Sequence, residues 1–289
     1  MSFLQPLISG ILTGGVYALA GIGMSLVFGV MNISNFAHGD LMMLGMYLAF
    51  FSFTLLHIDP YISLVLIIPI AFMFGYMMEK VFINRVIHHP HQNQILLTVG
   101  LGLIMSNTAL LAFTSDPKIL TTTYSSSAFN LFGDISVSVP LLLSFLITCL
   151  ITVILYLFLS KTATGMALRA TSQNREAAQL MGINVAKMSA IAFGIGTALA
   201  ATAGALIAPT YYIHPLAGHS FLLKAFTICV LGGLGSVVGA GVGGIIIGVV
   251  EAMSSTYLSS DWKDVIVFVI FLAVLLFRPQ GLFGKKGGQ

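Results

Sequence analysis

The sequence predicts an all-α, polytopic membrane protein whose 289 residues form one domain, residues 1–289. Hydrophobic residues make up 57% of the chain and charged residues only 7%, whereas a soluble domain carries about 25% charged residues. The apolar residues gather into eight runs, most of them near the roughly 20 residues that a helix needs to cross a bilayer. The basic residues gather in three of the segments that flank these runs, as in proteins with a defined cytoplasmic side.

Each apolar run predicts one membrane-embedded segment, so we expect about eight. Five precede a long polar interruption at residues 161–188, and three follow it. The expected segments are Leu4–Val30, Leu41–Leu56, Tyr61–Met78, Ile95–Phe113, Val139–Leu159, Ser189–Ala208, Leu222–Val250 and Val265–Phe277.

The positions of Lys and Arg predict the orientation of the chain. Of the twelve basic residues, all but Lys118, Lys224 and Lys263 lie after the third run, in the 161–188 interruption, or at the C-terminus. We therefore assign these three regions to the cytoplasm. The outer segments then carry the acidic residues Asp59, Asp116, Asp134, Asp261 and Asp264, and Glu251 is expected at the outer interface.

The run Leu222–Val250 is too long for a single crossing, and a single crossing would also place the basic C-terminus outside. Its middle reads LGGLGSVVGAGVGG, and glycines permit a helix to break. We expect a re-entrant segment that enters from outside, breaks at Gly232, Gly233 and Gly235, and leaves on the same side. One long tilted helix is the alternative.

A matching interruption, MNISNFAHGD, follows the first run. Paired interruptions, one in each half, are typical of transporters whose discontinuous helices meet near the bilayer midplane. The helix breaks and pathway candidates are therefore Asn35, His38, Gly39 and Asp40, together with the later glycines. The structural alternative makes Asp40 the N-cap of Leu41–Leu56, with His38 bonding nearby backbone. If the first run crosses once, the N-terminus lies outside.

Motifs for chemistry are lacking. The sequence has no phosphate-binding loop, no G-x-S-x-G and no HExxH, so we expect neither an enzyme nor a cofactor, and ATP must be bound by other proteins. His88, His89 and His91 share one loop without an acidic residue or cysteine beside them, and we expect a surface loop rather than a metal site. We expect the protein to lie in a lipid bilayer and not to bind nucleic acid.

The 161–188 interruption contains the sequence of a short helix. Asn174 is a good N-cap, Glu176 suits the first turn, and Gly182 supplies a left-handed stop. A helix of about two turns, Asn174–Met181, is too short to be stable alone in water. We expect it to lie against another protein on the cytoplasmic side; an ordinary amphipathic connector is the alternative.

This interruption also carries a resemblance. Glu176-Ala177-Ala178, three residues, then Gly182 resembles the E-A-A-x-x-x-G core of the cytoplasmic coupling loop in permease subunits of ABC importers. The longer string RATSQNREAAQLMGIN, and NFAHGDLMMLGMY near the start of the chain, are similar to the shorter permease subunit of the branched-chain amino acid importers. The residues that the resemblance assigns to coupling are Arg169, Arg175, Glu176, Ala177, Ala178 and Gly182.

The resemblance implies the ABC importer permease fold and a location in the bacterial inner membrane. It implies a second, related permease subunit, two ATP-binding subunits and an external substrate-binding protein, to which the polar loop at residues 115–138 would be exposed. The implied substrates are leucine, isoleucine and valine. Permeases for urea or short-chain amides look similar in these motifs, and an ion-coupled secondary carrier is the rival from another class.

Overall fold

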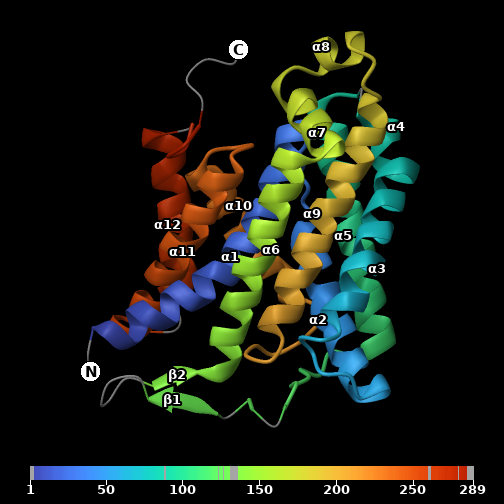
Figure 1. Ribbon diagram of the computed structural model, residues 1–289. Coiled ribbons are helices and arrows are strands. Elements are labelled where there is room, and N and C mark those ends of the chain that lie inside the picture. Colours follow the sequence, from blue (N-terminus) through green and yellow to red (C-terminus); the bar gives the residue numbers. More distant parts are fainter. Residues whose placement is uncertain are drawn as a thin grey trace.

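The structure is a computed structural model of a helical bundle (Figure 1). It describes residues 3–87, 89–122, 124–125, 127–130, 136–259, 262–278 and 280–284. Of the residues singled out above, His88, Asp134, Asp261, Lys285 and Lys286 lie outside the described residues. The rest of the predicted segments and sites can be compared with the structure directly.

The helices follow the predicted runs closely. In the first part of the chain they are α1 (Leu4–Met31), α2 (His38–Leu56), α3 (Leu64–Met78), a π-helical turn η1 (Glu79–Ile83), α4 (Asn84–Val86) and α5 (His91–Phe113). After a short antiparallel pair, β1 (Ala128–Asn130) and β2 (Ser136–Ser138), come α6 (Val139–Lys161), α7 (Ala163–Gln173), α8 (Arg175–Leu180), α9 (Val185–Ile207), α10 (Ala217–Gly232), α11 (Val237–Tyr257) and α12 (Trp262–Phe277).

Among the described residues, seven helices are long and apolar enough to cross a membrane, and α10 is a shorter apolar helix of 16 residues. The expectation of a polytopic all-α membrane protein is therefore confirmed. Several boundaries differ from the prediction. α2 begins at His38 rather than Leu41, and the span that begins with α3 continues through η1 and α4 to Val86. α5 and α9 each begin four residues earlier than predicted, and α11 continues to Tyr257 rather than ending at Val250.

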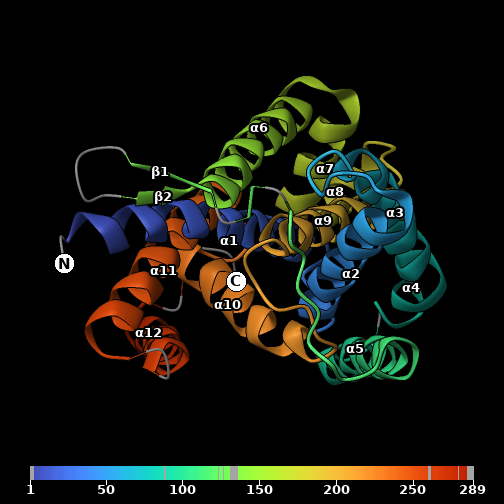
Figure 2. The same ribbon diagram turned by 90° about the horizontal axis from the view of Figure 1, so that it is seen from below.

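Helices α1 and α9 lie at the centre of the bundle (Figure 2). Their most apolar windows are 83% and 89% buried, against 22% for α5 and 17% for α6 at the periphery. α1 and α11 run antiparallel in backbone contact: a Cβ built on Gly14 would lie 2.8 Å from the carbonyl oxygen of Gly244, and one on Gly10 would lie 2.7 Å from Cα of Val249. Small residues thus allow the close packing that holds membrane helices together.

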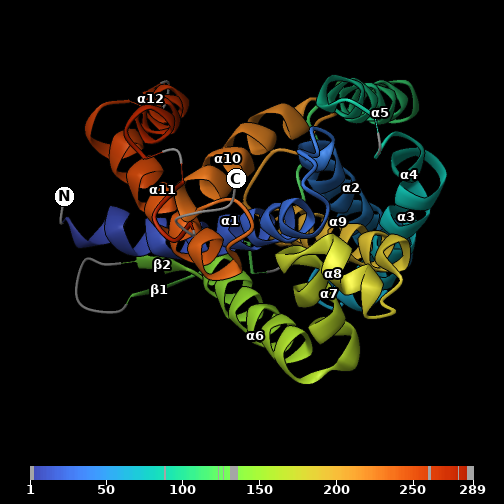
Figure 3. The same ribbon diagram turned by 90° about the horizontal axis from the view of Figure 1, so that it is seen from above.

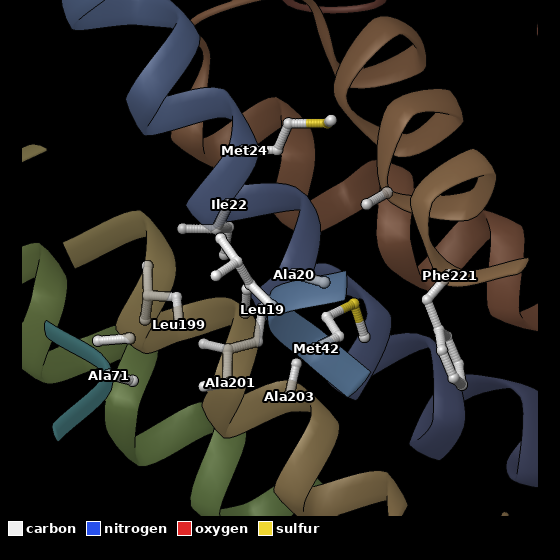
Figure 4. Packing of buried hydrophobic residues seen from close by; sticks show 14 of the residues in the cluster. Leu19, Ala20, Ile22, Met24, Met42, Ala71, Leu199, Ala201, Ala203 and Phe221 are labelled. Atoms are coloured by element: carbon white, nitrogen blue, oxygen red, sulfur yellow. The ribbon is translucent and has the colours of Figure 1, made fainter. Parts of the chain in front are cut away.

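The core is built from aliphatic and small side chains of α1, α2 and α9. Figure 4 shows Leu19 and Ala20 of α1 facing Met42 of α2 and Ala201 of α9. A Cβ on Gly204 of α9 would overlap the backbone of Met42. α2 and α9 therefore meet backbone to backbone, and neither helix has room to accept a larger side chain at this contact.

The break in the run Leu222–Val250 is confirmed. α10 ends at Gly232 and α11 begins at Val237, and Gly233 (φ 101°) and Gly235 (φ 82°) between them adopt left-handed backbone that favours glycine. The two helices form a hairpin whose turn lies beside the C-terminal segment, because Leu282 N donates to Leu231 O at 2.8 Å. The other ends of the two helices differ: α10 begins inside the bundle, where Gly218 lies against Gly39 of α2, whereas α11 continues to Tyr257.

One end of the bundle collects the described basic residues of the predicted cytoplasmic regions. α7, α8 and the C-terminal segment lie there, and the N-terminus and the β1–β2 pair lie at the opposite end (Figure 1). α1 is unbroken from Leu4 to Met31, so Leu4 lies at the end of the bundle that the predicted orientation makes external. Part of the external loop is ordered: β1 pairs with β2, and Lys118 pairs with Ile213 in an isolated bridge.

Candidate coupling surface and membrane pathway

The short cytoplasmic helix forms as its local sequence predicts. Asn174 is the N-cap of α8, and its Oδ1 accepts a hydrogen bond from Ala177 N at 2.9 Å. Gly182 follows the helix with φ 83°, in the left-handed region. Together with α7, α8 lies across the cytoplasmic end of the bundle, over α9 and α3 (Figure 3). α7 itself was not foreseen as a separate helix.

The surface that α8 presents to the cytoplasm is apolar at its C-terminal end. Leu180 is 88% exposed and Met181 82% exposed. They lie on or beside α8, at the end of the bundle that the predicted orientation assigns to the cytoplasm. Exposed large apolar side chains grouped in this way mark a site of protein interaction. The sequence analysis placed both residues in the helix but did not single them out.

The six residues that the resemblance assigns to coupling differ in their exposure. Glu176, Ala177 and Gly182 are exposed on or beside α8, and Arg169 is exposed on α7. Ala178 is buried and Arg175 half-buried, so these two face the bundle rather than the cytoplasm. α8 therefore has an outward face for a partner and an inward face that contacts the rest of this chain.

Arg175 reaches from α8 to the end of α1. Its Nη1 donates a hydrogen bond to the carbonyl oxygen of Met31 at 3.3 Å, one of the last carbonyls of α1, which have no partner within the helix. Burial lowers the pKa of Arg175, and the negative charge of Glu79 opposes this by raising the pKa. Glu79 was not foreseen. It lies in η1, only 1% of it is exposed, and its Oε1 has no hydrogen-bond partner among the described residues.

A cavity of about 650 Å³ separates α8 from the cytoplasmic end of the third span. Arg175, Glu176 and Gln179 of α8 line one side, and Asn84 and Ile87 line the other. The start of α9 also lines the cavity, where Ser189 is fully buried and its Oγ has no hydrogen-bond partner among the described residues. α8 is thus held away from the bundle over part of its length.

The first predicted interruption brings the start of α2 into the interior. His38 Nε2 and the carbonyl oxygen of Ala20 lie 2.9 Å apart, and Ala20 precedes the end of α1 by eleven residues. At a rise of about 1.5 Å per residue, α2 begins roughly 16 Å below the cytoplasmic end of α1. The backbone bond of His38 is therefore confirmed, but it joins α2 to α1 rather than to nearby residues.

The expectation that Asp40 is an N-cap is wrong. α2 begins two residues earlier, after Ala37, without a side-chain cap, because the chain turns back into the helix before it reaches Asp40. The Asp40 side chain instead lies between two glycines of other helices: a Cβ on Gly102 of α5 would be 2.5 Å from its Oδ2, and one on Gly218 of α10 would be 2.6 Å from its Oδ1.

The N-termini of α2 and α10 therefore meet inside the bundle. A Cβ on Gly39 would overlap the carbonyl oxygen of Gly218. Asp40 is 5% exposed, and its Oδ1 has no partner among the described residues. Asn35 stabilises the turn before α2 by accepting from Ala37 N at 3.1 Å. The start of α2 therefore meets the start of α10 near Gly218, and not the break at Gly232, Gly233 and Gly235 with which the sequence paired it.

Two further predictions are corrected. The predicted orientation left Lys224 outside and Glu251 at the outer interface, but neither side chain is solvated: Lys224 is buried in α10 and Glu251 in α11. Their side chains are 4% and 9% exposed, and Lys224 Nζ lies 2.6 Å from Glu251 Oε1. The two residues occupy opposite legs of the hairpin, so each supplies the counter-charge that burial of the other requires. Tyr17 and Tyr211 also contact this pair, through their hydroxyl groups.

Within the described ranges, no three His, Cys, Asp or Glu side chains are grouped so that they could hold a metal ion. Of the ionisable groups buried in the described part of the bundle, Lys224 and Glu251 are paired with each other, His38 and Asp40 lie where α2 begins, and Glu79 lies in η1 without an ion pair.

Comparison with known proteins agrees with this architecture. Residues 7–275 match the family model described as "Branched-chain amino acid transport system / permease component". The chain is 35% identical to the high-affinity branched-chain amino acid transport system permease protein BraD of Pseudomonas aeruginosa, over 98% of this chain and 96% of that protein. It is 34% identical to LivH of Escherichia coli K12 over the same shares, and 30% identical to the probable LivH of Methanocaldococcus jannaschii over 95% and 90%. The chain therefore belongs to the family of permease components of branched-chain amino acid transport systems.

Proposed function

We propose that this chain is one permease subunit of an ABC importer in the cytoplasmic membrane, where it forms half of the pore for branched-chain amino acids. It would work with a second, related permease subunit, two ATP-binding subunits and an external substrate-binding protein. The observation that carries this proposal is α8, a capped two-turn helix on the cytoplasmic face whose exposed end carries Leu180 and Met181.

The exposed face of α8 suits a groove in an ATP-binding subunit. A helix this short is not stable in isolation, yet α8 holds its shape through Asn174 and through Ala178, which packs against the bundle. Leu180 and Met181 would supply the apolar contact, with Glu176 beside them. Closure of the ATP-binding pair would then move α8, and the neighbouring spans would follow.

The pathway would lie beside the meeting point of α2 and α10. Asn35, His38, Gly39 and Asp40 position the start of α2 there, and Gly218 does so for α10. The glycines of the hairpin turn, Gly232, Gly233 and Gly235, would let the cytoplasmic end of α10 adjust during transport. Such a route is apolar with few polar groups, which suits an aliphatic amino acid that must not bind tightly.

The substrate class rests on the relatives, whose names give branched-chain amino acid transport. A permease for urea or short-chain amides would share this architecture, and uptake assays with each solute distinguish the two. An ion-coupled carrier is the rival mechanism. It predicts that the purified chain alone, in liposomes with an ion gradient, moves solute without ATP.

The decisive experiment removes the exposed apolar contact. In the complete transporter, we expect Leu180→Glu together with Met181→Glu to abolish co-purification of the ATP-binding subunits and to lower uptake at least tenfold. Met166→Glu, which changes a half-exposed methionine of α7, is the matched control and should retain both. Normal co-purification and uptake by the Leu180/Met181 variant would disprove the docking role of α8, and solute movement by the isolated chain would disprove the ABC mechanism.

A further inference from the structure

The inward face of α8 carries Arg175, whose hydrogen-bonding capacity is only partly satisfied. Arg175 has five N–H donors, and within the described residues its one hydrogen bond goes to Met31 O. Desolvation opposes a guanidinium in such a half-buried place unless an anion lies near it. The nearby anion is Glu79, whose charge acts on Arg175. No ion pair within 4.0 Å joins the two in the described part of the chain.

The Glu79 carboxylate also lacks hydrogen-bond partners in the part of the chain that the structure describes. It is 1% exposed, and its Oε1 lacks a hydrogen-bond partner among the described residues. A buried carboxylate without a partner is costly, and a π-helical turn such as η1 is itself an irregularity found often at functional sites. The fold therefore retains the buried Glu79 in an irregular turn, close enough for its charge to act on Arg175 but not within ion-pair distance of it.

Arg175 has free space beside it, toward the end of the third span, although Glu79 is not among the residues that line this space. The cavity of about 650 Å³ lies between α8 and the residues that follow η1, and Arg175 forms part of its wall. α8 is attached at both ends by residues outside the helical region: Asn174 is extended (φ −157°, ψ 108°) and Gly182 is left-handed. A short helix held between two such residues can move as a unit.

We propose that Arg175 and Glu79 are positioning residues for transport, and that α8 acts on the membrane spans by moving into this cavity until the two side chains form an ion pair. Arg175 already holds the end of α1 through Met31, and pairing with Glu79 adds the end of the third span. One guanidinium then joins α8, α1 and η1. Because α1 ends directly before the interruption that leads to α2, the movement reaches the meeting point of α2 and α10. This inference rests on the proposed function.

The first test removes each charge in the reconstituted transporter, Glu79 through an isosteric variant and Arg175 through a shorter neutral one. We expect Glu79→Gln and Arg175→Gln each to leave co-purification of the ATP-binding subunits and basal ATP hydrolysis unchanged while lowering uptake at least tenfold. Arg175→Lys, which keeps the charge, should retain part of the uptake. Lys187→Gln, at the exposed start of α9, is the matched loss of a positive charge and should transport normally.

The stability of the variant separates coupling from a merely structural role. Glu79→Gln removes an unpaired buried charge, so the variant should be at least as resistant to thermal unfolding as the parent. A stable protein that hydrolyses ATP without uptake supports the inference. A variant with normal uptake overturns it, and a variant that unfolds at a lower temperature also overturns it, because Glu79 would then serve stability instead.

Cross-linking measures the movement itself. Asn84 of α4 and Gln179 of α8 both line the cavity, so Asn84→Cys and Gln179→Cys would be introduced together with Cys149→Ser, which removes the exposed native thiol. With short bifunctional thiol reagents, we expect the yield to rise severalfold when the ATP-binding subunits are trapped with nucleotide, and Glu79→Gln to prevent that rise. Equal yields in both nucleotide states would overturn the inference. If instead the ATP-binding subunits do not bind the parent chain at all, the proposed function fails.

Discussion

The buried Lys224–Glu251 pair makes a quantitative prediction about stability. Replacing Lys224 with Met leaves the Glu251 carboxylate buried, and among the described residues its remaining hydrogen-bond partner is the Tyr211 hydroxyl, 3.3 Å from its Oε1. Removing one member of a buried pair costs about 3–5 kcal/mol, so Lys224→Met should lower the free energy of unfolding by about that amount. Unfolding would be followed in mixed micelles of a mild detergent and SDS.

The reverse variant should cost less. After Glu251→Gln, Lys224 Nζ keeps the Tyr17 hydroxyl at 3.3 Å and the half-exposed Asp264 carboxylate at 3.6 Å. A hydrogen bond to a charged group contributes about 1.5–3 kcal/mol, and these two contacts offset part of the loss. We therefore expect Glu251→Gln to destabilise the protein by about 1–3 kcal/mol.

The double variant decides whether the pair or its individual members matter. Replacing both residues with Met removes both buried charges at similar volume, a change that is often neutral or stabilising. We expect the double variant to unfold within about 1 kcal/mol of the parent, far from the sum of the single effects. If the single losses simply add, or if Lys224→Met is harmless, then the two side chains are not a mutually compensating pair and the reasoning fails.

Three further outcomes follow from the packing and from the caps of α8. Gly204→Ala should destabilise the protein by about 1–3 kcal/mol, because the added Cβ would overlap the backbone of Met42. Gly100→Ala is the control, since a Cβ at Gly100 would have no atom within 4 Å. Thermal unfolding of the two variants measures the difference. Gly182→Ala should lower the affinity for the ATP-binding subunits, because the left-handed backbone at φ 83° costs alanine about 1–2 kcal/mol. Gly182→Asn should be tolerated. If both variants lowered the affinity equally, the backbone conformation of Gly182 would not be the cause. Asn174→Ala should weaken the same binding by roughly 1 kcal/mol through loss of the cap, and unchanged affinity in a titration would show that the cap is dispensable.

Local signals in the sequence predicted the local structure well. α8 begins after Asn174 and is followed by left-handed Gly182 because a cap and a stop act over a few residues. The hairpin turn at Gly233 and Gly235 was found for the same reason, since few other residues adopt its backbone angles. These signals, together with the lengths of the apolar runs, were sufficient for the order of the spans.

Contacts between distant parts of the chain could not be read in the same way. Lys224 and Glu251 are 27 residues apart and become partners only because the hairpin folds one leg on the other. Each alone resembles an ordinary charge near a helix end, so both were placed in water. The inward direction of Arg175 depends likewise on where α1 ends, 144 residues earlier in the chain.

The meeting of α2 and α10 has an electrostatic consequence. Each helix start carries roughly half a positive elementary charge, so two starts in contact bring about one positive charge to the interior. Asp40, wedged against Gly218, brings one negative charge when ionised. The sum is near zero, so a zwitterion passing this point would encounter neither a strong trap nor a strong barrier from the protein's fixed charges.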